Sequence, residues 1–255
     1  MTGDGWTLHL GDCIAGLATL GDKSVDVTIC DPPYEAEAHT QSRRHLSKKR
    51  DGKYGDGRFA TEHAIPFAAI TEDERTRVSA QMARVTKRWI LVFCQVEAAM
   101  LWRVALEVAG AGYIRTAIWV KHGTPQFTGD RPGMGYESIV IAHRAGKKRW
   151  NGGGKCGVFR HNEHHMSSGN SQSPHPTTKP LPLMSELVDL FSDPGDLILD
   201  PFAGSGTTGV AARMLGRRFI GWELSPAYHA IACRRLNGDE AVPNAAQPSL
   251  FGGVQ

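Results

Sequence analysis

The sequence predicts an α/β fold with a mostly parallel sheet and helices on both faces of that sheet. Apolar runs of strand length alternate with longer amphipathic segments through most of the 255 residues. Two of these runs end in turns rich in Pro or Gly, at the position where open parallel sheets bind their ligands. Charged residues make up 22% and hydrophobic residues 41%, as in ordinary globular proteins. We therefore expect a single domain over residues 1–237.

The expected strands and helices alternate in chain order. Strands are predicted where β-branched and other apolar residues concentrate, at Trp6–Leu10, Val25–Cys30, Trp89–Cys94, Ile114–Val120, Ser138–Ala142, Leu197–Leu199 and Phe219–Trp222. Helices are predicted at Thr71–Arg88, Val96–Ala109, Leu183–Phe191, Thr207–Leu215 and Pro226–Leu236. Thr71 opens the first helix with Glu74 three residues later, which is a capping-box pattern. Gly110 and Gly112 close the second helix.

The net charge of +3 is unevenly distributed along the chain. Thr40–Arg58 carries seven Lys and Arg against two Asp, and His143–His165 carries six against one Glu. These residues fall within two long insertions without helix or strand pattern, 35–65 and 144–178, and such loops in an enzyme are usually functional or disordered. Two basic, Gly-rich segments on an otherwise acidic body indicate arms that contact a polyanion. Solvated loops are the alternative.

The sequence shows neither a membrane span nor a secretion signal. Apolar runs such as Trp89–Cys94 are too short to cross a bilayer, and Met1–Gly5 does not have the pattern of a signal peptide. The five cysteines are an odd number without close pairing, which favours a reduced, cytoplasmic chain. Residues 238–255, rich in Pro, Ala, Asn and Gln, are predicted to form a flexible C-terminal tail.

A glycine-rich turn between a predicted strand and a predicted helix indicates a cofactor site. Gly204, Gly206 and Gly209 have the spacing GxGxxG, and Glu223 ends the next strand. Glycines let a ligand approach the backbone, and the acid can bind ribose hydroxyls. NAD and S-adenosylmethionine both suit such a turn. Asp200 at its entry favours the second, because a carboxylate attracts a cationic amino-acid group and repels a pyrophosphate; a dehydrogenase is the alternative.

Asp31-Pro32-Pro33-Tyr34 follows an apolar strand and has the residue types needed to activate an amino group on a base. The exocyclic amine of adenine is a poor nucleophile, because its lone pair is delocalised into the ring. A carboxylate from Asp31 and a backbone carbonyl from the Pro-Pro turn could accept its two N–H bonds. Tyr34 offers a face on which the base could stack once it is flipped out of the duplex. The alternative is a rigid turn after a strand.

In its order of motifs the chain resembles the amino-group DNA methyltransferases of bacteria and phages. The catalytic tetrapeptide comes first and the glycine-rich loop last, which resembles the permuted β group of these enzymes. Gly11-Asp12-Cys13 and His175–Pro180 also match family segments, and Tyr136-Glu137-Ser138 looks like a family feature without an assigned role. The resemblance covers nearly all of Trp6–Leu236. It implies a Rossmann-like class I methyltransferase fold: a seven-stranded, mostly parallel sheet whose last strand is inserted antiparallel.

The resemblance implies an enzyme that transfers a methyl group from S-adenosylmethionine to a base in duplex DNA. The implied catalytic residues are Asp31, Pro32, Pro33 and Tyr34. The implied cofactor site comprises Asp12, Cys13, Asp31, Thr177, Thr178, Lys179, Asp200, Phe202, Ala203, Gly204, Ser205, Gly206, Thr207, Thr208, Glu223 and Leu224. The basic side chains expected to contact DNA are Arg43, Arg44, Lys48, Lys49, Arg50, Lys147, Lys148, Arg149, Lys155 and Arg160. Most of these would bind phosphates and position the duplex.

Asp at the head of the tetrapeptide, where Ser is common in cytosine-N4 enzymes, favours adenine N6 as the target. The alternatives are a cytosine-N4 enzyme, an enzyme acting on RNA or protein amides, and a DNA-binding relative without turnover. The intact tetrapeptide and glycine-rich loop argue against the last of these.

Three further interpretations concern metals and partners. His161–His165 lacks the paired spacing of a zinc site, so we expect no metal there and favour a polar loop at DNA. Gln247–Phe251 resembles the peptide by which bacterial proteins bind the replicative sliding clamp, with Leu250 and Phe251 as anchors; a free tail is the alternative. A homodimer also remains open, as does pairing with a restriction nuclease.

Overall fold

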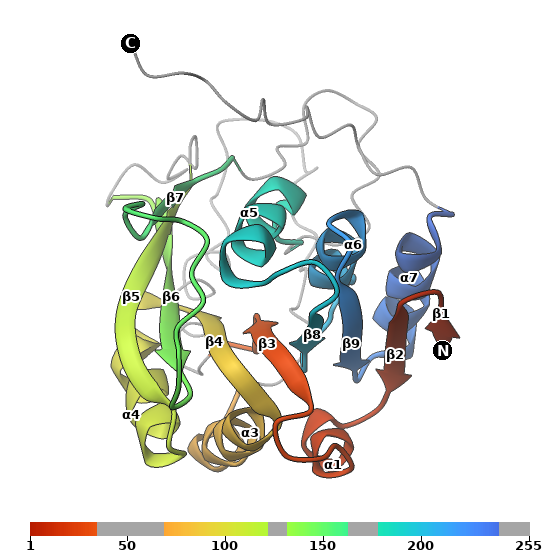
Figure 1. Ribbon diagram of the computed structural model, residues 1–255, viewed down its shortest axis with the longest axis horizontal. Helices are drawn as coiled ribbons and strands as arrows, with labels where there is room; N and C mark the ends of the chain where they lie inside the picture. The colour runs from red at the N-terminus through yellow and green to blue at the C-terminus, as the bar shows by residue number, and fades with distance from the viewer. Residues whose placement is uncertain (35–68, 122–131, 163–177, 240–255) are drawn as a thin grey trace, which may run out of the picture.

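The computed structural model describes residues 1–34, 69–121, 132–162 and 178–239, and these form one twisted sheet with helices on both faces (Figure 1). The strands are β1 (Thr2–Gly3), β2 (Trp6–Leu10), β3 (Val25–Cys30), β4 (Thr86–Cys94), β5 (Gly112–Val120), β6 (Tyr136–His143), β7 (Val158–Arg160), β8 (Leu197–Asp200) and β9 (Arg218–Glu223). The helices are α1 (Cys13–Ala18), α3 (Glu72–Val85), the short 3₁₀ helix η1 (Val96–Ala98), α4 (Ala99–Val108), α5 (Leu181–Phe191), α6 (Thr207–Met214) and α7 (Pro226–Asn237).

The sheet has the order β1-β2-β9-β8-β3-β4-β6-β5-β7. Strands β2, β9, β8, β3 and β4 are parallel to one another, so their carboxyl ends meet at one edge. The predicted class is confirmed, with nine strands instead of seven, because the short strands β1 and β7 extend the two sides. The inserted antiparallel strand is β6, between β4 and β5. It lies in the middle of the chain and not at its end.

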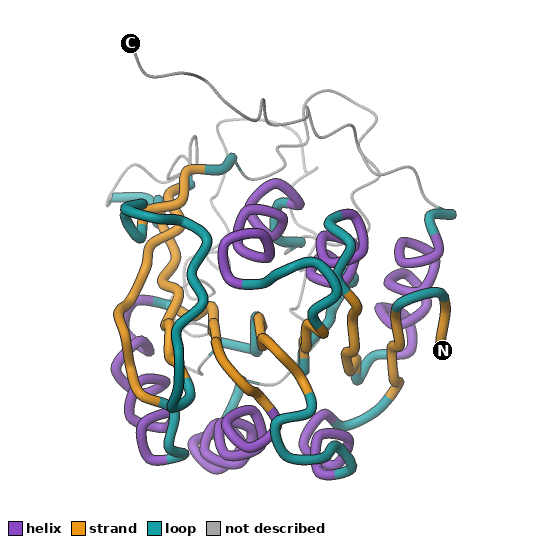
Figure 2. Tube along the Cα trace, in the orientation of Figure 1, coloured by secondary structure: helices purple, strands orange, loops and turns teal. Residues whose placement is uncertain are grey.

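Among the described helices, α5, α6 and α7 cover one face of the sheet and α1, α3 and α4 cover the other (Figures 1 and 2). One core is formed where α5, α6 and α7 pack on the sheet, with Leu91 and Phe93 of β4 fully buried against Leu187. The other is formed where α1, α3 and α4 pack on the opposite face, around Val92 and Trp102. Alternate residues of β4 enter the two cores, because successive side chains of a strand point to opposite faces. The apolar run is continuous since both of its faces are buried.

The boundary between α3 and β4 differs from the sequence prediction. The helix ends at Val85, three residues before the predicted end, and the strand begins at Thr86. Thr86 pairs with Val25 of β3, and its hydroxyl lies 2.6 Å from that of Thr28 in a buried contact. Pairing with β3 therefore overrides the local helical pattern, which continues to Arg88 in the sequence alone.

Several smaller elements were absent from the prediction. The strands β1 and β7 are two and three residues long, too short to leave a periodic pattern. Helix α1 has a signal that was overlooked, because the Asp12 carboxylate accepts the amide N–H of Ala15 at 2.8 Å as an N-cap. The predicted helix from Val96 begins as a 3₁₀ turn and becomes α-helical at Ala99.

The parts of the chain outside the described residues include several sequence-based expectations. The insertion at 35–65, the tail peptide Gln247–Phe251 and Thr177 lie there, as do the predicted DNA contacts Arg43, Arg44, Lys48, Lys49 and Arg50. These remain predictions. Among the helices that are described, none is both long and apolar enough to cross a membrane.

The predicted capping box is present at the start of α3. The Thr71 hydroxyl accepts the amide N–H of Glu74 at 3.2 Å, and the Glu74 carboxylate accepts the amide N–H of Thr71 at 2.8 Å. Thr71→Ala should lower the free energy of unfolding by about 1 kcal/mol, because it removes the N-cap acceptor. Urea unfolding measures this, with Thr71→Ser as the matched control that keeps the hydroxyl. Equal losses in the two variants would contradict the capping role.

Candidate active site

The catalytic tetrapeptide and the glycine-rich loop lie side by side at the carboxyl edge of the sheet. Asp31 follows β3 and Asp200 ends β8, and these two strands pair in parallel with Thr28 opposite Leu199. Strand order reverses here, since β3 leads to β4 on one side and β8 leads to β9 on the other. Such a switch point is where open α/β sheets bind ligands.

Asp31 is held by a lysine that comes from a distant part of the chain. The Lys179 Nζ lies 2.7 Å from Asp31 Oδ2 and 3.0 Å from Glu137 Oε2. Lys179 also donates a hydrogen bond of 3.4 Å to the Tyr34 hydroxyl. The second oxygen of Asp31, Oδ1, is buried and has no hydrogen-bond partner among the described residues. An ionised carboxylate is an acceptor only, so this oxygen keeps unused acceptor capacity.

The ammonium of Lys179 is enclosed by aromatic rings as well as by carboxylates. It lies 5.2 Å from the centroid of the Phe93 ring, 5.7 Å from that of Tyr34 and 5.8 Å from that of Trp119. Phe93 and Trp119 are buried in the core. The faces of these rings stabilise a cation, so the charge of Lys179 is retained in a largely apolar environment.

The electrostatics of this cluster follow from burial and from the two lysines. Burial raises the pKa of Asp31; the Lys179 ammonium opposes this rise and the Glu137 carboxylate adds to it. Burial alone would also raise the pKa of Glu137, but Lys179 and Lys121 together lower it to about 2. Lys121 Nζ lies 2.5 Å from Glu137 Oε1. Glu137 is therefore ionised at neutral pH, whereas burial favours the neutral form of Asp31.

The glycine-rich loop is shaped by the two acids that flank it. Asp200 Oδ1 accepts the amide N–H of Phe202 at 3.0 Å, and its Oδ2 accepts the hydroxyl of Thr208 at 2.6 Å. Glu223 Oε2 accepts the amide N–H of Gly204 at 2.8 Å. Gly206 has φ +80°, and a Cβ there would lie 3.0 Å from the Cβ of Ala232, so a side chain is excluded. The loop thus presents its backbone at the edge of the sheet.

The third glycine of the pattern serves packing. A Cβ at Gly209 would lie 2.7 Å from the Phe219 ring and 2.8 Å from Leu236. The absence of a side chain brings α6 close to β9, as the third glycine of such loops does.

The segment that follows β2 reaches the same edge. The amide N–H of Gly11 donates to the carbonyl of Glu223 at 2.9 Å, because β2 and β9 are parallel neighbours. Asp12 is exposed and caps α1. Burial raises the pKa of the Cys13 thiol to about 12, with the Asp12 carboxylate adding to the rise, so this thiol is protonated at neutral pH.

Comparison with known proteins identifies the family of this arrangement. The family model described as DNA methylase, which groups adenine-N6 and cytosine-N4 enzymes, matches residues 25–234. The chain belongs to this DNA methylase family. The match includes the tetrapeptide, Glu137, Lys179 and the glycine-rich loop. The predicted recognition, made from the order of these motifs, is therefore confirmed.

Relatives and solved structures agree with the family match. The chain is 25% identical to the type II methyltransferase M.HinfI of Haemophilus influenzae over 93% of its own length and 70% of that protein. The structure of M1.HpyAVI in complex with S-adenosylmethionine is 25% identical, has a TM-score of 0.65 and covers 91% of this chain and 99% of its own. The PvuII DNA methyltransferase, described as cytosine-N4-specific, has a TM-score of 0.66 at 16% identity, over 91% and 86% of the two chains.

These comparisons confirm S-adenosylmethionine as the cofactor of this DNA methylase. The carboxylates of Asp31 and Glu223 both act on that of Asp200, and these three acids would favour a cationic ligand over a pyrophosphate. The residues at the edge therefore fit the methyl donor.

The predicted cofactor residues fall into two groups. At the edge lie Asp12, Cys13, Asp31, Phe202, Gly204, Glu223 and Leu224, which is 72% exposed. Ala203, Ser205, Gly206, Thr207, Thr208 and Asp200 are buried within the loop. Asp200 in particular has both oxygens occupied by the loop itself. A direct contact between its carboxylate and the cofactor therefore remains a prediction.

Thr178 and Lys179 connect the two motifs instead of acting on the loop alone. The Thr178 hydroxyl lies 3.3 Å from that of Ser205, while Lys179 reaches Asp31. Sequence analysis assigned no role to Glu137 and overlooked Lys121 and Arg235, whose guanidinium donates to the Ser205 carbonyl at 2.5 Å. A charged residue in the apolar strand β6 was the available signal for Glu137.

The basic segment after β6 requires a correction. Trp89 pairs with His143 and Cys94 with Ser138, so residues after His143 begin at the edge opposite the catalytic one. Since a strand rises about 3.3 Å per residue, the two ends of this pairing are about 17 Å apart. Lys147, Lys148 and Arg149 therefore lie away from a duplex bound at Asp31, contrary to the expectation for them.

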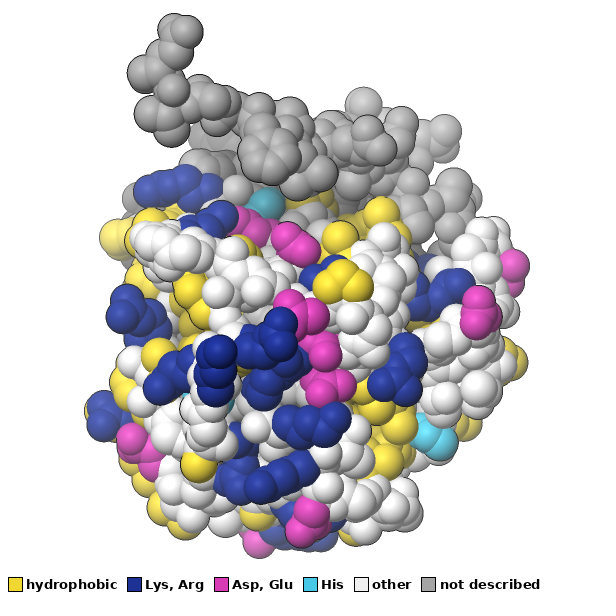
Figure 3. Space-filling model, viewed as in Figure 1, with side chains coloured by type: hydrophobic (Ala, Val, Ile, Leu, Met, Phe, Trp, Pro, Cys, Tyr) yellow, Lys and Arg dark blue, Asp and Glu magenta, His cyan; other side chains and the backbone are white. Residues whose placement is uncertain are grey.

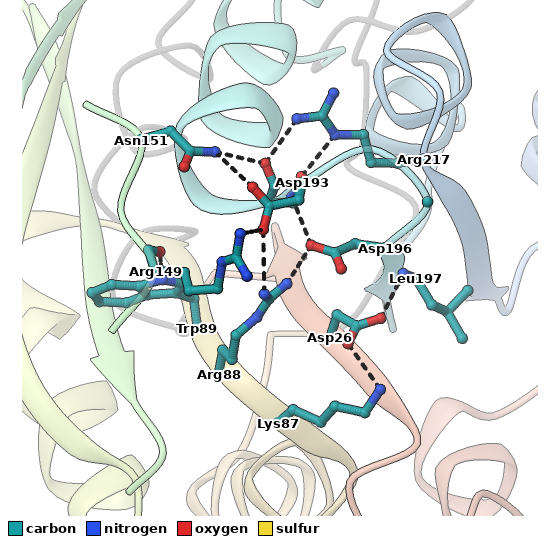
Figure 4. Close-up of polar contacts among 12 residues, drawn as sticks. Asp26, Lys87, Arg88, Trp89, Arg149, Asn151, Asp193, Asp196, Leu197 and Arg217 are labelled. Atoms are coloured by element: carbon teal, nitrogen blue, oxygen red, sulfur yellow. Dashed lines mark hydrogen bonds and ion pairs between the residues drawn. The ribbon is translucent and has the colours of Figure 1, made fainter. Parts of the chain in front are cut away.

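Part of this opposite edge is neutralised by acidic residues. Arg149 lies 2.7 Å from the carboxylate of Asp193, and Arg88 pairs with Asp193 and Asp196 (Figure 4). Figure 3 shows Lys and Arg gathered on this face around a stripe of Asp and Glu. Lys155 pairs with Glu186 of α5. Of the described DNA-contact candidates, Arg160 is exposed at the catalytic edge, because it pairs with Val120 at the end of β5.

Asp200→Asn should remove a pH dependence of folding. Burial raises the pKa of Asp200 from 3.8 to about 7, against the opposing bonds from Thr208 and Phe202. The stability that its neutral form contributes is fully present below about pH 4 and is lost as the pH rises through 7.

The unfolding free energy of the wild type, relative to Asp200→Asn, should therefore fall by up to a few kcal/mol over this range, since one pKa unit corresponds to about 1.4 kcal/mol. Urea unfolding of both proteins across the range measures it. A difference that is constant with pH would contradict the raised pKa.

Proposed function

We propose that this DNA methylase transfers a methyl group from S-adenosylmethionine to the N6 amine of adenine in duplex DNA. The observation that carries the proposal is the state of Asp31. One of its oxygens is fixed by Lys179, and the other is buried and without a hydrogen-bond partner beside the glycine-rich loop. A free, oriented acceptor at the cofactor site is what the activation of an amine requires.

Each residue of the tetrapeptide has a separate role in the proposed reaction. Asp31 Oδ1 accepts one N–H of the exocyclic amine, and the Pro32 carbonyl accepts the other, so that the nitrogen lone pair is withdrawn from the ring. Tyr34 provides a face for the flipped base. S-adenosylmethionine supplies an electrophilic methyl group on its sulfonium. As the amine nitrogen forms its bond to the methyl carbon, the S–CH3 bond of the sulfonium would break and S-adenosylhomocysteine would leave. The amine would then give up one proton, with the Asp31 carboxylate as its acceptor.

The edges of the structure support a duplex over this site. The amide N–H of Ile70 donates to the Tyr34 carbonyl at 3.3 Å, so the insertion that contains Thr40–Arg58 leaves and rejoins the fold at the catalytic edge. Residue 162 and Thr178, which flank the next insertion, lie after β7 and beside Ser205 at the same edge. The Lys and Arg residues of the first insertion would contact phosphates beside a flipped base at this edge.

Cytosine N4 is the second candidate, because the PvuII enzyme, which is described as cytosine-N4-specific, has the same fold. The exocyclic amine of cytosine also needs the same activation as that of adenine. The Asp at the head of the tetrapeptide favours adenine. Genomic DNA from cells that lack methylated bases should be incubated with the protein and S-adenosylmethionine, and its nucleosides analysed by mass spectrometry. We expect N6-methyladenine. N4-methylcytosine as the product would overturn the assignment, and sequencing of the modified DNA would give the recognition site.

Asp31→Ala should reduce methyl transfer by roughly 10²- to 10⁴-fold while leaving the binding of DNA largely intact, because it removes the acceptor of the amine. Transfer of a radioactive methyl group measures the rate. Asp26→Asn is the control, since Asp26 lies at the other end of the same strand and pairs with Lys87 at 2.8 Å. Transfer at the wild-type rate in Asp31→Ala would refute the mechanism.

A further inference from the structure

Four side chains of alternating charge form a line at the catalytic edge. Asp31 contacts Lys179, Lys179 contacts Glu137, and Glu137 contacts Lys121, with N–O separations of 2.7, 3.0 and 2.5 Å. They come from the end of β3, the start of α5, β6 and the end of β5, so the line joins four separate parts of the chain. The tetrapeptide is only its first member.

Three of the four side chains are largely buried, whereas that of Asp31 is 28% exposed. The side chains of Lys179 and Glu137 are each 10% exposed, and that of Lys121 is 12% exposed. Buried charges are costly, and replacing such pairs by apolar residues is often neutral or stabilising. A buried ion network next to a cofactor loop therefore indicates a functional requirement. Glu137 lies in the middle, with a lysine on each of its two oxygens.

Glu137 determines how Lys179 meets Asp31. Lys179 forms ion pairs with Asp31 and Glu137 and donates a hydrogen bond to the Tyr34 hydroxyl. The approach to Glu137 Oε2 at 3.0 Å is an ion pair without hydrogen-bond geometry. If Glu137 were neutral, Asp31 alone would attract this ammonium strongly. Lys179 could then move toward Asp31 and occupy Oδ1 as well as Oδ2. The oxygen that is buried without a partner would no longer be available to a ligand.

We propose that Glu137 is a positioning residue of methyl transfer: by holding Lys179 on its own side, it leaves Asp31 Oδ1 for the amine of the target base. This inference rests on the proposed function. Lys121 completes the arrangement by neutralising the second oxygen of Glu137. Asp31, which touches the substrate in this scheme, is the catalytic residue, whereas Glu137 acts through Lys179.

Substitutions of Lys179 and Glu137 should shift the pKa of Asp31 in opposite directions. Lys179 lowers the pKa of Asp31 and Glu137 raises it. The other groups that face Asp31 are Lys121 at the end of β5, Asp200 at the end of β8, and Tyr34 and Cys30 on its own segment. These are common to all the variants below, so the comparison isolates Lys179 and Glu137.

The decisive experiment compares Glu137→Gln with Lys179→Met in single-turnover methyl transfer as a function of pH. Glu137→Gln should slow transfer by roughly 10- to 100-fold on the plateau, as small misplacements in active sites do. The acid limb of the pH–rate profile of this variant should move to lower pH, because loss of a negative neighbour lowers the pKa of Asp31. Lys179→Met should move the acid limb to higher pH, because a positive neighbour is lost. The dissociation constant of S-adenosylmethionine should change little in Glu137→Gln.

Controls separate positioning from general damage. Asp26→Asn removes an ion-paired carboxylate from the opposite edge and should leave the pH profile unchanged. If Glu137→Gln unfolds, Glu137→Asp keeps the charge with a shorter reach and should give a rate between wild type and background. An unchanged rate and profile in Glu137→Gln, or shifts of the same direction in both variants, would overturn the inference.

A substrate-independent measurement keeps this test separate from the proposed function. The carboxyl carbon of Asp31 can be followed by NMR in ¹³C-Asp-labelled protein, assigned with Asp31→Asn. Its titration should move down in Glu137→Gln and up in Lys179→Met even if the wild type methylates no base. In that case the proposed function is refuted, but the effect of Glu137 and Lys179 on Asp31 is still supported. Active wild-type protein with unshifted titrations in both variants would instead remove only the inference.

Discussion

The parallel pairing of β3 with β8 is the constraint on which the site depends. Val27 and Thr28 lie opposite Ile198 and Leu199, so the turn after each strand opens at the same edge. The tetrapeptide and the glycine-rich loop, near opposite ends of the sequence, become neighbours through this pairing alone. Because strand order reverses between these two strands, their helices leave toward opposite faces and the space beyond the carboxyl ends remains open to ligands.

The second requirement is compensation of charge at that open edge. Asp31, Asp200 and Glu223 converge there, and burial raises the pKa of all three carboxyl groups. The loop satisfies Asp200 and Glu223 with its own N–H groups and a hydroxyl. Asp31 has no such bonds and is compensated by Lys179. The acid that is left incompletely satisfied is the one at the proposed reacting centre, as expected for a preorganised acceptor.

The features predicted correctly from sequence are those with local signals. The strand–turn–helix context of the glycine-rich loop, the capping box at Thr71 and the alternation of apolar runs all depend on residues close together in the chain. The end of α3 was placed wrongly because pairing of Thr86 with β3 competes with the helix, and that competition is not local. The contacts of Lys179 with Asp31 and Glu137 were missed for the same reason, since they join residues from separate strands and segments.

The placement of the basic residues was the largest error, and its cause is the direction of one strand. Composition alone treats His143–His165 as a single arm, but β6 runs antiparallel and delivers its first residues to the edge opposite the site. The chain then returns along β7, and among the described basic residues predicted to contact DNA it is Arg160 that reaches the catalytic edge. A charge run therefore predicts a polyanion contact only when the direction of the preceding strand is known.

The two aspartates Asp26 and Asp31, in β3 and in the turn that follows it, have different roles because their surroundings differ. Asp26 lies at the amino end, where one oxygen accepts the amide N–H of Leu197 at 2.9 Å and the other pairs with Lys87 at 2.8 Å. Both of its oxygens are satisfied, and despite burial these bonds lower its pKa. Asp31 at the carboxyl end has one lysine and one buried oxygen without a partner. An aspartate paired with a lysine is common to both ends; the incomplete pairing at Asp31 makes it available for chemistry, whereas the complete pairing at Asp26 fastens two strands together.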